Sequence, residues 1–409
     1  MTLGDRSNTK YDLVVYGATS FVGQILCRYL VERHGTDGAS LRWAIAGRNT
    51  TKLAEVADST GADVDRIVAD AADRDALDAM VDTTSVVVST VGPYALHGSE
   101  LVGAVVEAGR GYCDLTGEVQ WMRRMIDAHQ ERAQETGARI VHACGFDSIP
   151  SDLGVWFTQQ RSIERFGEPC VEVAMSVAGM KGGVSGGTAA SGINMFEEMA
   201  ADRELREIVS NPYVLAPVDM RSGVEQPGSA IPTRDARFES WVAPFVMAPT
   251  NAAVVLRTHA LLGQPWGREF TYGETMMTGD GVMGATKAMS IAGGLAAFAG
   301  AASLGPTRKL LARLVPGPGE GPDPSKQQAG WFDVRFVGTT AGGDTTRTKV
   351  TGDRDPGYGS TARMLGESAA ALVDADELEG GFWTPASALG DALIERLESS
   401  AGVRFDVLE

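Results

Sequence analysis

The sequence predicts an α/β protein built around a doubly wound parallel sheet. Three features of residues 1–150 support this: short apolar runs alternate with helical stretches, a glycine-rich loop follows the first apolar run, and Ser85–Val91 is uncharged and rich in β-branched residues. Uncharged β-branched runs are typical of strands buried on both faces. Strands that alternate with helices favour parallel pairing, because parallel strands need a crossover connection.

The expected elements of this first region follow one another regularly. Strands are expected at Tyr11–Tyr16, Leu41–Ala46, Asp65–Ala69, Ser85–Val91, Tyr112–Leu115 and Arg139–Ala143. Helices are expected at Phe21–Arg33, Lys52–Asp58, Arg74–Val81, Ser99–Ala108 and Val119–Thr136. In the last of these helices Val119, Met122 and Ile126 form an apolar stripe opposite Arg123 and Asp127, so one face is expected to pack against the sheet.

The pattern changes after Pro150. A strand is expected at Val171–Ala178, followed by a glycine-rich loop at Gly182–Thr188 and a helix near Ala189–Ala201. Residues 209–280 are rich in loop-forming residues and give no clear assignment.

The last part of the sequence predicts a hairpin and two helices. A Pro/Gly-rich link at Pro316–Pro324 precedes Trp331–Val337 and Thr345–Thr351, in which apolar and polar residues alternate. Two alternating runs separated by glycines predict an antiparallel hairpin. Amphipathic helices are then expected at Tyr358–Val373 and Ala386–Leu397.

Composition and charge limit the classes of function. Hydrophobic residues make up 44% of the chain and charged residues 22%, as in an ordinary globular protein. The formal net charge of −17 repels phosphate backbones and argues against nucleic-acid binding. The 4 cysteines form no CxxC pair, and the 5 histidines show no paired spacing, so no metal site is predicted. Scattered thiols and a polar N-terminus without a signal-peptide core indicate a reduced, cytoplasmic protein.

One segment raises the question of a membrane. Ala288–Gly305 carries no charged residue over 18 positions, a length at the lower limit of a membrane span. It consists mostly of Ala, Gly and Ser, which gain little from hydrocarbon, so a buried or interfacial segment is favoured over a span. The basic residues Arg308, Lys309 and Arg313 follow at helical spacing, which suits weak association with an anionic membrane surface.

The strongest motif is the loop from Gly17 to Gly23, GATSFVG, which lies between the first strand and the first helix. This is where a dinucleotide pyrophosphate meets the positive end of a helix in a Rossmann domain. Gly17 would permit the tight turn, and Gly23 would let the helix pack closely on the strand. Ser20 stands where such loops often have glycine, and it either contacts a phosphate or caps the helix. The expected cofactor contacts of this loop are Gly17, Thr19, Ser20, Phe21, Val22 and Gly23. The competing interpretation is a plain structural turn.

The end of the second strand indicates which coenzyme is bound. An NAD site usually places Asp or Glu there for the ribose hydroxyls, but this chain has Ala46-Gly47-Arg48-Asn49 and then Lys52. Arg48 offers a planar fork suited to a 2′-phosphate. We therefore expect NADP, with Arg48, Asn49 and Lys52 at the adenosine end. The alternative is an ordinary surface arginine at a loop.

Three further sites follow later strands. Asp70 is placed either to contact the adenine or to cap the next helix. Val91, Gly92 and Pro93 end the fourth strand at the expected cofactor cleft, near the nicotinamide. Tyr94 is then either a proton donor or a wall of the pocket, and the wall is favoured, because most pocket aromatics serve shape.

The segment Gly145–Asp152, GFDSIPSD, follows the sixth strand. Its small polar side chains can line a site, with Ser148 as a candidate for the chemistry, or can cap the helix that begins near Pro150. Both interpretations remain open at this point.

Taken in order, these motifs resemble a known family. GATSFVG, AGRN, VGPY, YCDLTGE and GFDSIPSD resemble the saccharopine dehydrogenase-like oxidoreductases. SGGTAASG, GWFDVRFVG and GFWTPASALGDALIERL resemble more narrowly the mycobacterial-type trans-acting enoyl reductase branch. The resemblance covers nearly the whole chain and is thinnest between residues 209 and 280.

The resemblance implies an architecture and a chemistry. It implies an NADP-binding Rossmann domain over residues 1–150, a second α+β domain over 151–355, and C-terminal helices over 356–409 that return to the first domain. Gly17, Gly23 and Arg48 carry over as cofactor residues, whereas no catalytic acid does. Relatives in the enoyl reductase branch reduce a carbon–carbon double bond in a polyketide-derived chain held on a synthase.

The resulting hypothesis is a cytoplasmic NADPH-dependent reductase of a lipid-like acyl substrate, small or carrier-bound, with Tyr94 and Ser148 as catalytic candidates. One alternative is an imine or amino-acid reductase of the saccharopine dehydrogenase type. Another is a non-catalytic NADP-binding protein at a membrane surface. The sequence leaves the oligomeric state open.

Overall fold

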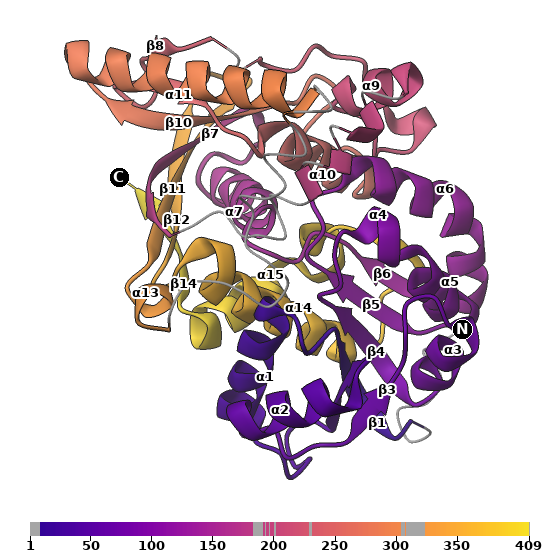
Figure 1. The fold of residues 1–409 in the computed structure, drawn as a ribbon. Coiled ribbons are helices and arrows are strands. Elements are labelled where there is room, and N and C mark those ends of the chain that lie inside the picture. The colour runs from indigo at the N-terminus through magenta and orange to yellow at the C-terminus, as the bar shows by residue number, and fades with distance from the viewer. Residues whose placement is uncertain are drawn as a thin grey trace.

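The computed structural model describes residues 9–182, 191–192, 194–195, 197–199, 202–228, 231–303, 307 and 324–408. Two seven-stranded sheets organise the chain, and Figure 1 shows them at different ends of the molecule. The elements β1 to β6 and α1 to α7 come from the N-terminal part of the chain. Elements β7 to β12 form most of the second sheet.

The first sheet is parallel throughout, with strand order β13-β6-β5-β4-β1-β2-β3. Its strands are β1 (Tyr11–Tyr16), β2 (Trp43–Gly47), β3 (Arg66–Val68), β4 (Thr84–Ser89), β5 (Gly111–Asp114), β6 (Arg139–Val141) and β13 (Gly381–Trp383). The order reverses between β1 and β4, because β2 lies on one side of β1 and β4 on the other. In doubly wound sheets, ligands bind beyond the carboxyl ends of the strands at this reversal.

Helices cover both faces of this sheet, and β1 shows why its sequence is apolar throughout. Leu13 and Val15 belong to one buried core, which also includes side chains of α1 and α14, whereas Val14 and Tyr16 belong to a second core with α3, α5 and α6. Successive side chains of a strand point to opposite faces. The helices are α1 (Phe21–His34), α2 (Thr50–Thr60), α3 (Arg74–Val81), α4 (Tyr94–His97), α5 (Ser99–Glu107), α6 (Val119–Thr136) and α14 (Thr361–Asp374).

The second sheet is mixed, with strand order β14-β12-β11-β7-β10-β9-β8. Its strands are β7 (Cys170–Lys181), β8 (Thr233–Asp235), β9 (Ser240–Pro244), β10 (Thr271–Gly279), β11 (Trp331–Thr340), β12 (Thr345–Gly352) and β14 (Val403–Leu408). Only β7 and β10 pair in parallel among these described strands. The predicted antiparallel hairpin is confirmed by the pairing of β11 with β12.

Two helices fill the inner face of the second sheet. They are α7 (Ile149–Phe166) and α10 (Ala248–Leu261), and α7 approaches β11 very closely at Gly154. A Cβ at Gly154 would lie 2.2 Å from Cζ of Phe336, so only glycine permits this contact. The remaining helical elements are α9 (Arg203–Ser210), η2 (Val218–Met220), α11 (Gly281–Ser303), α13 (Pro324–Gln328), η3 (Pro356–Ser360), α15 (Pro385–Arg396) and η4 (Leu397–Ala401).

The predicted return of the C-terminal helices to the first domain is confirmed. Helix α14 packs against α1 and against strands β4 and β5. The return is more extensive than predicted, because β13 extends the parallel sheet beside β6, and β14 then pairs with β12 of the second sheet. The C-terminal segment thus contributes a strand to each sheet.

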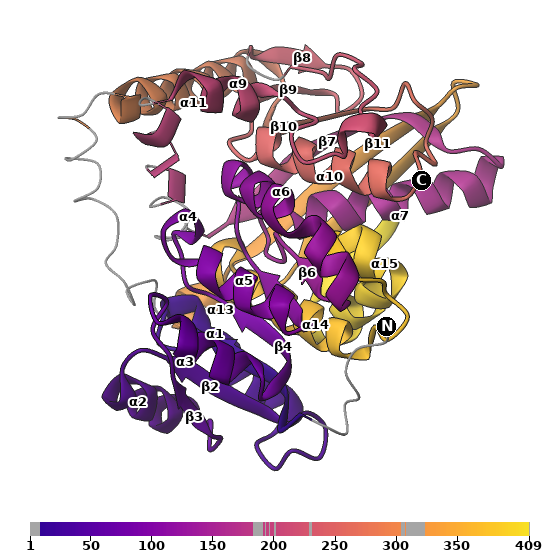
Figure 2. The same cartoon turned by 90° about the vertical axis from the view of Figure 1, so that its right-hand side faces the viewer.

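Helix α11 differs from the burial alternative considered for Ala288–Gly305. It begins seven residues earlier than that segment, at Gly281, and only 11% of its apolar 18-residue window is buried. By length and composition the helix is apolar enough to cross a membrane. Burial of this segment in a domain core was therefore wrong. Figure 2 shows α11 along the edge of the molecule. The residues Arg308, Lys309 and Arg313 lie outside the described part of the chain, as do most of Gly182–Thr188 and parts of Ala189–Ala201.

Candidate cofactor and active site

The turn after β1 has the geometry of a dinucleotide loop. Gly17 adopts φ 87°, a left-handed conformation that favours glycine. A Cβ at Gly17 would lie 2.6 Å from Cγ2 of Val91 and 2.8 Å from Oγ1 of Thr90. A Cβ at Gly23 would lie 2.3 Å from the carbonyl oxygen of Gly17. The two glycines therefore bring the loop, the start of α1 and the end of β4 into direct main-chain contact.

Ser20 completes the turn as the N-cap of α1. Its Oγ accepts a hydrogen bond from the N–H of Gly23 at 2.9 Å. Oγ1 of Thr90 donates to the carbonyl of Gly17 at 2.9 Å, so the 2.9 Å contact between the two hydroxyls makes Ser20 the donor to Thr90. Of the two roles considered for Ser20, helix capping is present in the structure, and the phosphate contact stays a prediction.

The N-terminus of α1 presents main-chain donors at this loop. Phe21 and Val22 are its first two residues, and the first N–H groups of a helix have no acceptor within it. These groups and the helix dipole favour an anion. The ring of Phe21 packs edge-on against Tyr358, with centroids 4.8 Å apart, which fixes the helix start against the C-terminal segment.

The end of β2 lies beside this loop and carries an exposed arginine. A Cβ at Gly47 would be 3.9 Å from Oγ1 of Thr19, so the two turns are neighbours. Arg48 and Lys52 are exposed, and the side chain of Asn49 caps α2 by accepting from the N–H of Lys52 at 3.0 Å. No carboxylate stands at the end of β2.

Asp70 and Arg48 both act electrostatically on Tyr16. Burial raises the pKa of Tyr16 to about 12, with Asp70 raising it further and Arg48 lowering it. Both side chains therefore lie near the end of β1. Asp70 accepts from the N–H of Ala72 at 3.0 Å, and it is Asp73 that caps α3. The capping role considered for Asp70 was therefore wrong, and its adenine contact stays a prediction.

The loop after β4 places Tyr94 beneath the surface. Val91, Gly92 and Pro93 follow the strand, with Val91 against Gly17, and α4 begins at Tyr94. The hydroxyl of Tyr94 donates to the carbonyl of Ser89 at 3.0 Å, and its ring stacks on Trp121 at 5.4 Å between centroids. Burial raises the pKa of Tyr94 well above its usual value. This environment favours a packing role over proton donation.

Glu118 holds the same loop from the other side. Its carboxylate accepts from the N–H groups of Tyr94 and Ala95 at 2.8 and 3.0 Å, and from the hydroxyl of Ser191 at 2.7 Å. An acid at the N-terminus of α4 satisfies donors that the helix leaves free. Because Ser191 belongs to the second part of the chain, Glu118 connects that part with the loop after β4.

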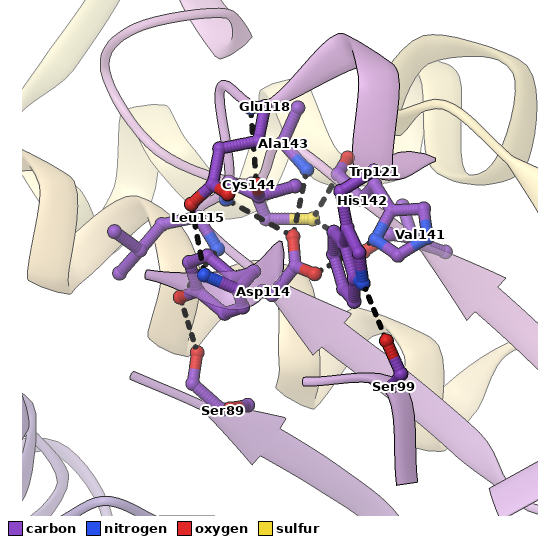
Figure 3. Close-up of polar contacts among 12 residues, drawn as sticks. Ser89, Ser99, Asp114, Leu115, Glu118, Trp121, Val141, His142, Ala143 and Cys144 are labelled. Atoms are coloured by element: carbon purple, nitrogen blue, oxygen red, sulfur yellow. Dashed lines mark hydrogen bonds and ion pairs between the residues drawn. The ribbon is translucent and has the colours of Figure 1, made fainter. Parts of the chain in front are cut away.

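Asp114 organises the two loops that follow β5 and β6 (Figure 3). Its Oδ1 accepts from the N–H groups of Thr116 and Ala143, each at 3.1 Å, and its Oδ2 lies 2.7 Å from Nδ1 of His142. Ala143 has φ 63°, an unusual conformation for a residue with a Cβ, which these bonds help to hold. Nε2 of His142 is buried and has no hydrogen-bond partner among the residues that the structure describes.

Ser148 lies at the start of α7 in a buried polar network. Its hydroxyl donates to Oδ1 of Asn251 at 3.0 Å, and Nδ2 of Asn251 donates to Glu274 at 2.9 Å. Tyr272 donates to the same carboxylate at 2.6 Å, and burial raises the pKa of Glu274 to about 7. Ser148 occupies the N-cap position of α7, as the capping interpretation expects, but its side chain makes no capping hydrogen bond.

Asp152 forms a second buried carboxyl site one helical turn further along α7. It accepts from the hydroxyl of Thr258 at 2.5 Å and from the N–H of Ala386 at 2.8 Å, which joins α7, α10 and α15. Burial raises the pKa of Asp152 to about 7. This residue supports the start of α7, and the sequence analysis named it only as the last residue of the segment Gly145–Asp152.

The structure thus brings the loop residues Gly17–Gly23, the end of β2 and the loop after β4 to one edge of the parallel sheet. Thr90, Asp114 and Glu118 also stand there, although the sequence reasoning assigned them no role. Each of them follows a strand or ends one, which is the pattern that could have identified them. Asp114 and Glu118 both lie within the motif YCDLTGE.

Comparison with known proteins places the chain in a family. The saccharopine dehydrogenase NADP-binding domain family matches residues 13–141. A Mycobacterium tuberculosis protein named as a trans-acting enoyl reductase is 40% identical over 411 residues, covering 96% of each chain. The trans-acting enoyl reductase of Mycobacterium bovis is 37% identical, covering 96% of this chain and 97% of its own. The chain belongs to the trans-acting enoyl reductase family.

A solved structure supports the same fold for this enoyl reductase family member. Saccharopine dehydrogenase (L-Glu forming) from Saccharomyces cerevisiae superposes with a TM-score of 0.57 at 12% identity, covering 98% of this chain and 100% of that chain. The predicted resemblance and the Rossmann-type α/β class are both confirmed.

NADP is the cofactor of this oxidoreductase. The residues present fit it, because a Cβ would fill the space at Gly17 and Gly23, the start of α1 offers N–H groups, and Arg48 is exposed after β2, where residues 47–52 include no Asp or Glu. Binding of the 2′-phosphate by Arg48, with help from Lys52 and Asn49, is our assignment.

We predict that Arg48 sets the coenzyme preference. A charge-assisted hydrogen bond contributes roughly 1.5–3 kcal/mol, so NADPH should bind at least about tenfold more tightly than NADH. Arg48→Ala should weaken NADPH binding and leave NADH almost unchanged, because NADH lacks the phosphate. Titration of both coenzymes by nicotinamide fluorescence measures this. Arg66→Ala, at the start of β3, is the matched control and should alter neither affinity. Equal affinities in the wild type, or parallel losses in Arg48→Ala, would contradict the assignment.

We also predict that Tyr94→Phe retains near-normal turnover. The ring still stacks on Trp121, and the lost bond to Ser89 should cost about 0.5–1.5 kcal/mol of folding free energy. Tyr94→Ala removes the ring and should impair substrate binding. Steady-state kinetics together with denaturant unfolding separates the two effects. A fall in turnover of roughly 10²–10⁴-fold in the Phe variant, at unchanged NADPH affinity, would instead identify Tyr94 as a general acid.

Proposed function

We propose that this protein is an NADPH-dependent enoyl reductase that acts in trans on a polyketide-derived acyl chain held on a carrier. The observation that supports this most strongly is the similarity to relatives named as trans-acting enoyl reductases, at 37–40% identity over 96% of the chain. The cofactor edge agrees with it, since the loop after β1 and the exposed Arg48 suit a phosphorylated dinucleotide.

The chain's share of the chemistry is to orient the two reactants and to stabilise negative charge. NADPH, when bound, supplies a hydride to the β-carbon of a double bond conjugated to a carbonyl. Charge then develops on the carbonyl oxygen, where fixed hydrogen-bond donors stabilise it. Ser148 remains our candidate for a donor, because its hydroxyl stands at the start of α7, directly after the loop that Asp114 holds. Tyr94 is the second candidate. Its hydroxyl donates to Ser89 and that of Ser148 donates to Asn251, so either group has to exchange that bond for one to the substrate oxygen.

An imine or amino-acid reductase is the alternative chemistry on the same fold. Such a site needs cationic side chains for a substrate carboxylate. The buried Arg257 lies on α10, the helix that also carries Asn251 of the Ser148 network, but it donates to the carbonyls of Leu215 and Phe382. It is therefore engaged by the main chain, which favours the enoyl substrate.

The deciding experiment supplies NADPH deuterated at the transferred position together with a crotonyl pantetheine thioester. We expect NADPH oxidation and a butyryl product that carries deuterium at the β-carbon, detected by mass spectrometry. Gly17→Val, which closes the dinucleotide loop, is the inactive control. Reduction of a 2-oxo acid with an amine, and none of the thioester, would establish the imine reductase instead.

A second candidate role is reversible association of this cytoplasmic enzyme with a membrane surface. The observation that favours it is the exposure of α11, on which Val282 and Met283 are 86% and 72% exposed. Apolar helices that lie in an interface bind lipid through such side chains and through flanking basic residues.

We expect weak flotation of the protein with anionic liposomes that decreases with salt. Replacing Arg308, Lys309 and Arg313 with Gln should reduce it, since each basic residue near an anionic surface contributes about 1 kcal/mol. Equal flotation of mutant and wild type at low salt would show that these three basic residues do not contribute to membrane binding. Flotation without reduction of any acyl or imine substrate would support the non-catalytic alternative.

A further inference from the structure

A groove of about 730 Å³ runs between helix α11 and the second sheet. The helix contributes Met283, Thr286, Lys287, Ser290 and Ile291, which share one helical face at spacings of three and four residues. The sheet contributes Ala178 from β7, Met277 from β10 and Phe238 from the turn between β8 and β9. Its volume lies in the range of small-molecule sites, roughly 300–1,000 Å³.

The groove exists because α11 docks along one side only. A Cβ at Gly284 would be 2.1 Å from the carbonyl of Gly279 and 3.4 Å from Cδ1 of Trp241, and Ala288 is fully buried. The helix therefore rests tightly on β9 and β10 through small residues. On its other side the floor is formed by Ala178 and by Gly279, whose small size leaves the space open.

The hydroxyl groups along the groove are bonded to the main chain. Ser240 donates to the carbonyl of Trp241 at 2.8 Å, and Thr278 donates to that of Gly284 at 2.9 Å. On the helix, Thr286 and Ser290 each donate to the carbonyl four residues earlier, at 2.9 Å. A hydroxyl group that already donates its hydrogen to a main-chain carbonyl has no hydrogen left to donate to a ligand. The walls of the groove are therefore mainly apolar in what they offer a ligand.

Charge is confined to two lining residues, Lys287 and Glu239. Lys287 is exposed, and no ion pair joins it to any described residue. It is also the only charged residue of α11, in a chain whose net charge is −17. An apolar groove with an unpaired cation on its helical wall is complementary to a molecule with a hydrocarbon tail and an anionic head.

We propose that this groove binds the hydrocarbon tail of a single anionic amphiphile, a long-chain carboxylate or alkyl phosphate, with Lys287 beside the head group. The site goes beyond the proposed reduction and does not depend on it. Figures 1 and 2 show α11 at the opposite end of the molecule from α1 and α2, which border the cofactor loop. Met277 and Met283 suit such a ligand, because methionine adapts to irregular apolar shapes.

The test compares two exposed methionines of the same helix. Met283 lines the groove, whereas Met289 is 56% exposed and does not line it. We expect dodecanoate, titrated below its micelle concentration by calorimetry, to bind with one site per chain. Met283→Gln should weaken that binding by roughly fivefold to tenfold through lost apolar contact. Met289→Gln should weaken it by less than about twofold, because Met289 does not line the groove and a surface substitution away from the site has little effect. In spectra of methyl-labelled methionine, the Met277 and Met283 signals should shift and that of Met289 should not.

The head group is tested with Lys287→Gln against three probes. Binding of dodecanoate and dodecyl phosphate should weaken by about twofold to fivefold, as for an exposed ion pair, and binding of dodecanol should not change. Comparing the loss of affinity for dodecanoate with that for dodecyl phosphate shows with which head group Lys287 interacts more strongly.

Several results would overturn the proposal. Equal losses in the two methionine variants would place the amphiphile elsewhere, and vesicle binding without binding of the monomeric probes would make α11 a membrane surface only. A concentration-dependent dimer abolished by Met283→Gln, without dodecanoate binding, would make the groove an interface between two copies. Failure of crotonyl thioester reduction would remove the proposed activity and leave the dodecanoate result unaffected.

Discussion

The close contact between Gly17, Gly23 and Thr90 is the constraint on which the cofactor edge depends. It occurs where the strand order reverses, so the loop after β1, the start of α1 and the end of β4 must meet without side chains between them. The hydroxyl of Ser20 donates a hydrogen bond to Thr90, and the hydroxyl of Thr90 donates to the carbonyl of Gly17. The Ser20 hydroxyl accepts from the N–H of Gly23, whereas the N–H groups of Phe21 and Val22 at the start of α1 have no acceptor within the helix.

The same edge is held from the second part of the chain by buried polar residues. Glu118 bonds to Ser191, and Asp152 bonds to residues of α10 and α15, so loops of the parallel sheet are tied to elements far away in sequence. Asp114 adds a local tie between the loops after β5 and β6. Each carboxylate accepts at least two hydrogen bonds, which compensates the cost of burying it.

Elements could be predicted from the local sequence where one sequence pattern was clear. Helix α6 matched its predicted bounds, because its apolar stripe is unambiguous. The presence of parallel strands up to β6 was predicted from the alternation of strands and helices, whereas their order in the sheet was not. Strand β13 could not be foreseen, since three residues carry no periodicity and only pairing with β6 makes them a strand. The buried placements of Tyr94 and Ser148 were equally hidden, because their partners Ser89 and Asn251 are set by tertiary packing. Helix α11 is apolar in composition but largely exposed. Its exposure could not be predicted, because hydropathy describes composition and does not show which faces of a helix other elements cover.

Hydroxyl groups bonded to main-chain carbonyls serve opposite purposes at the two ends of this protein. At the cofactor loop, Thr90 donates to the carbonyl of Gly17, which holds the turn after β1 against the end of β4. Along α11, Thr286 and Ser290 bond back to their own helix, which removes donors from the surface and makes a polar composition behave as an apolar one. The same kind of hydrogen bond therefore shapes the loop to which we assign the cofactor at the parallel sheet and gives an apolar wall at the mixed sheet. The difference lies in whether the carbonyl that accepts belongs to a glycine turn or to a helix.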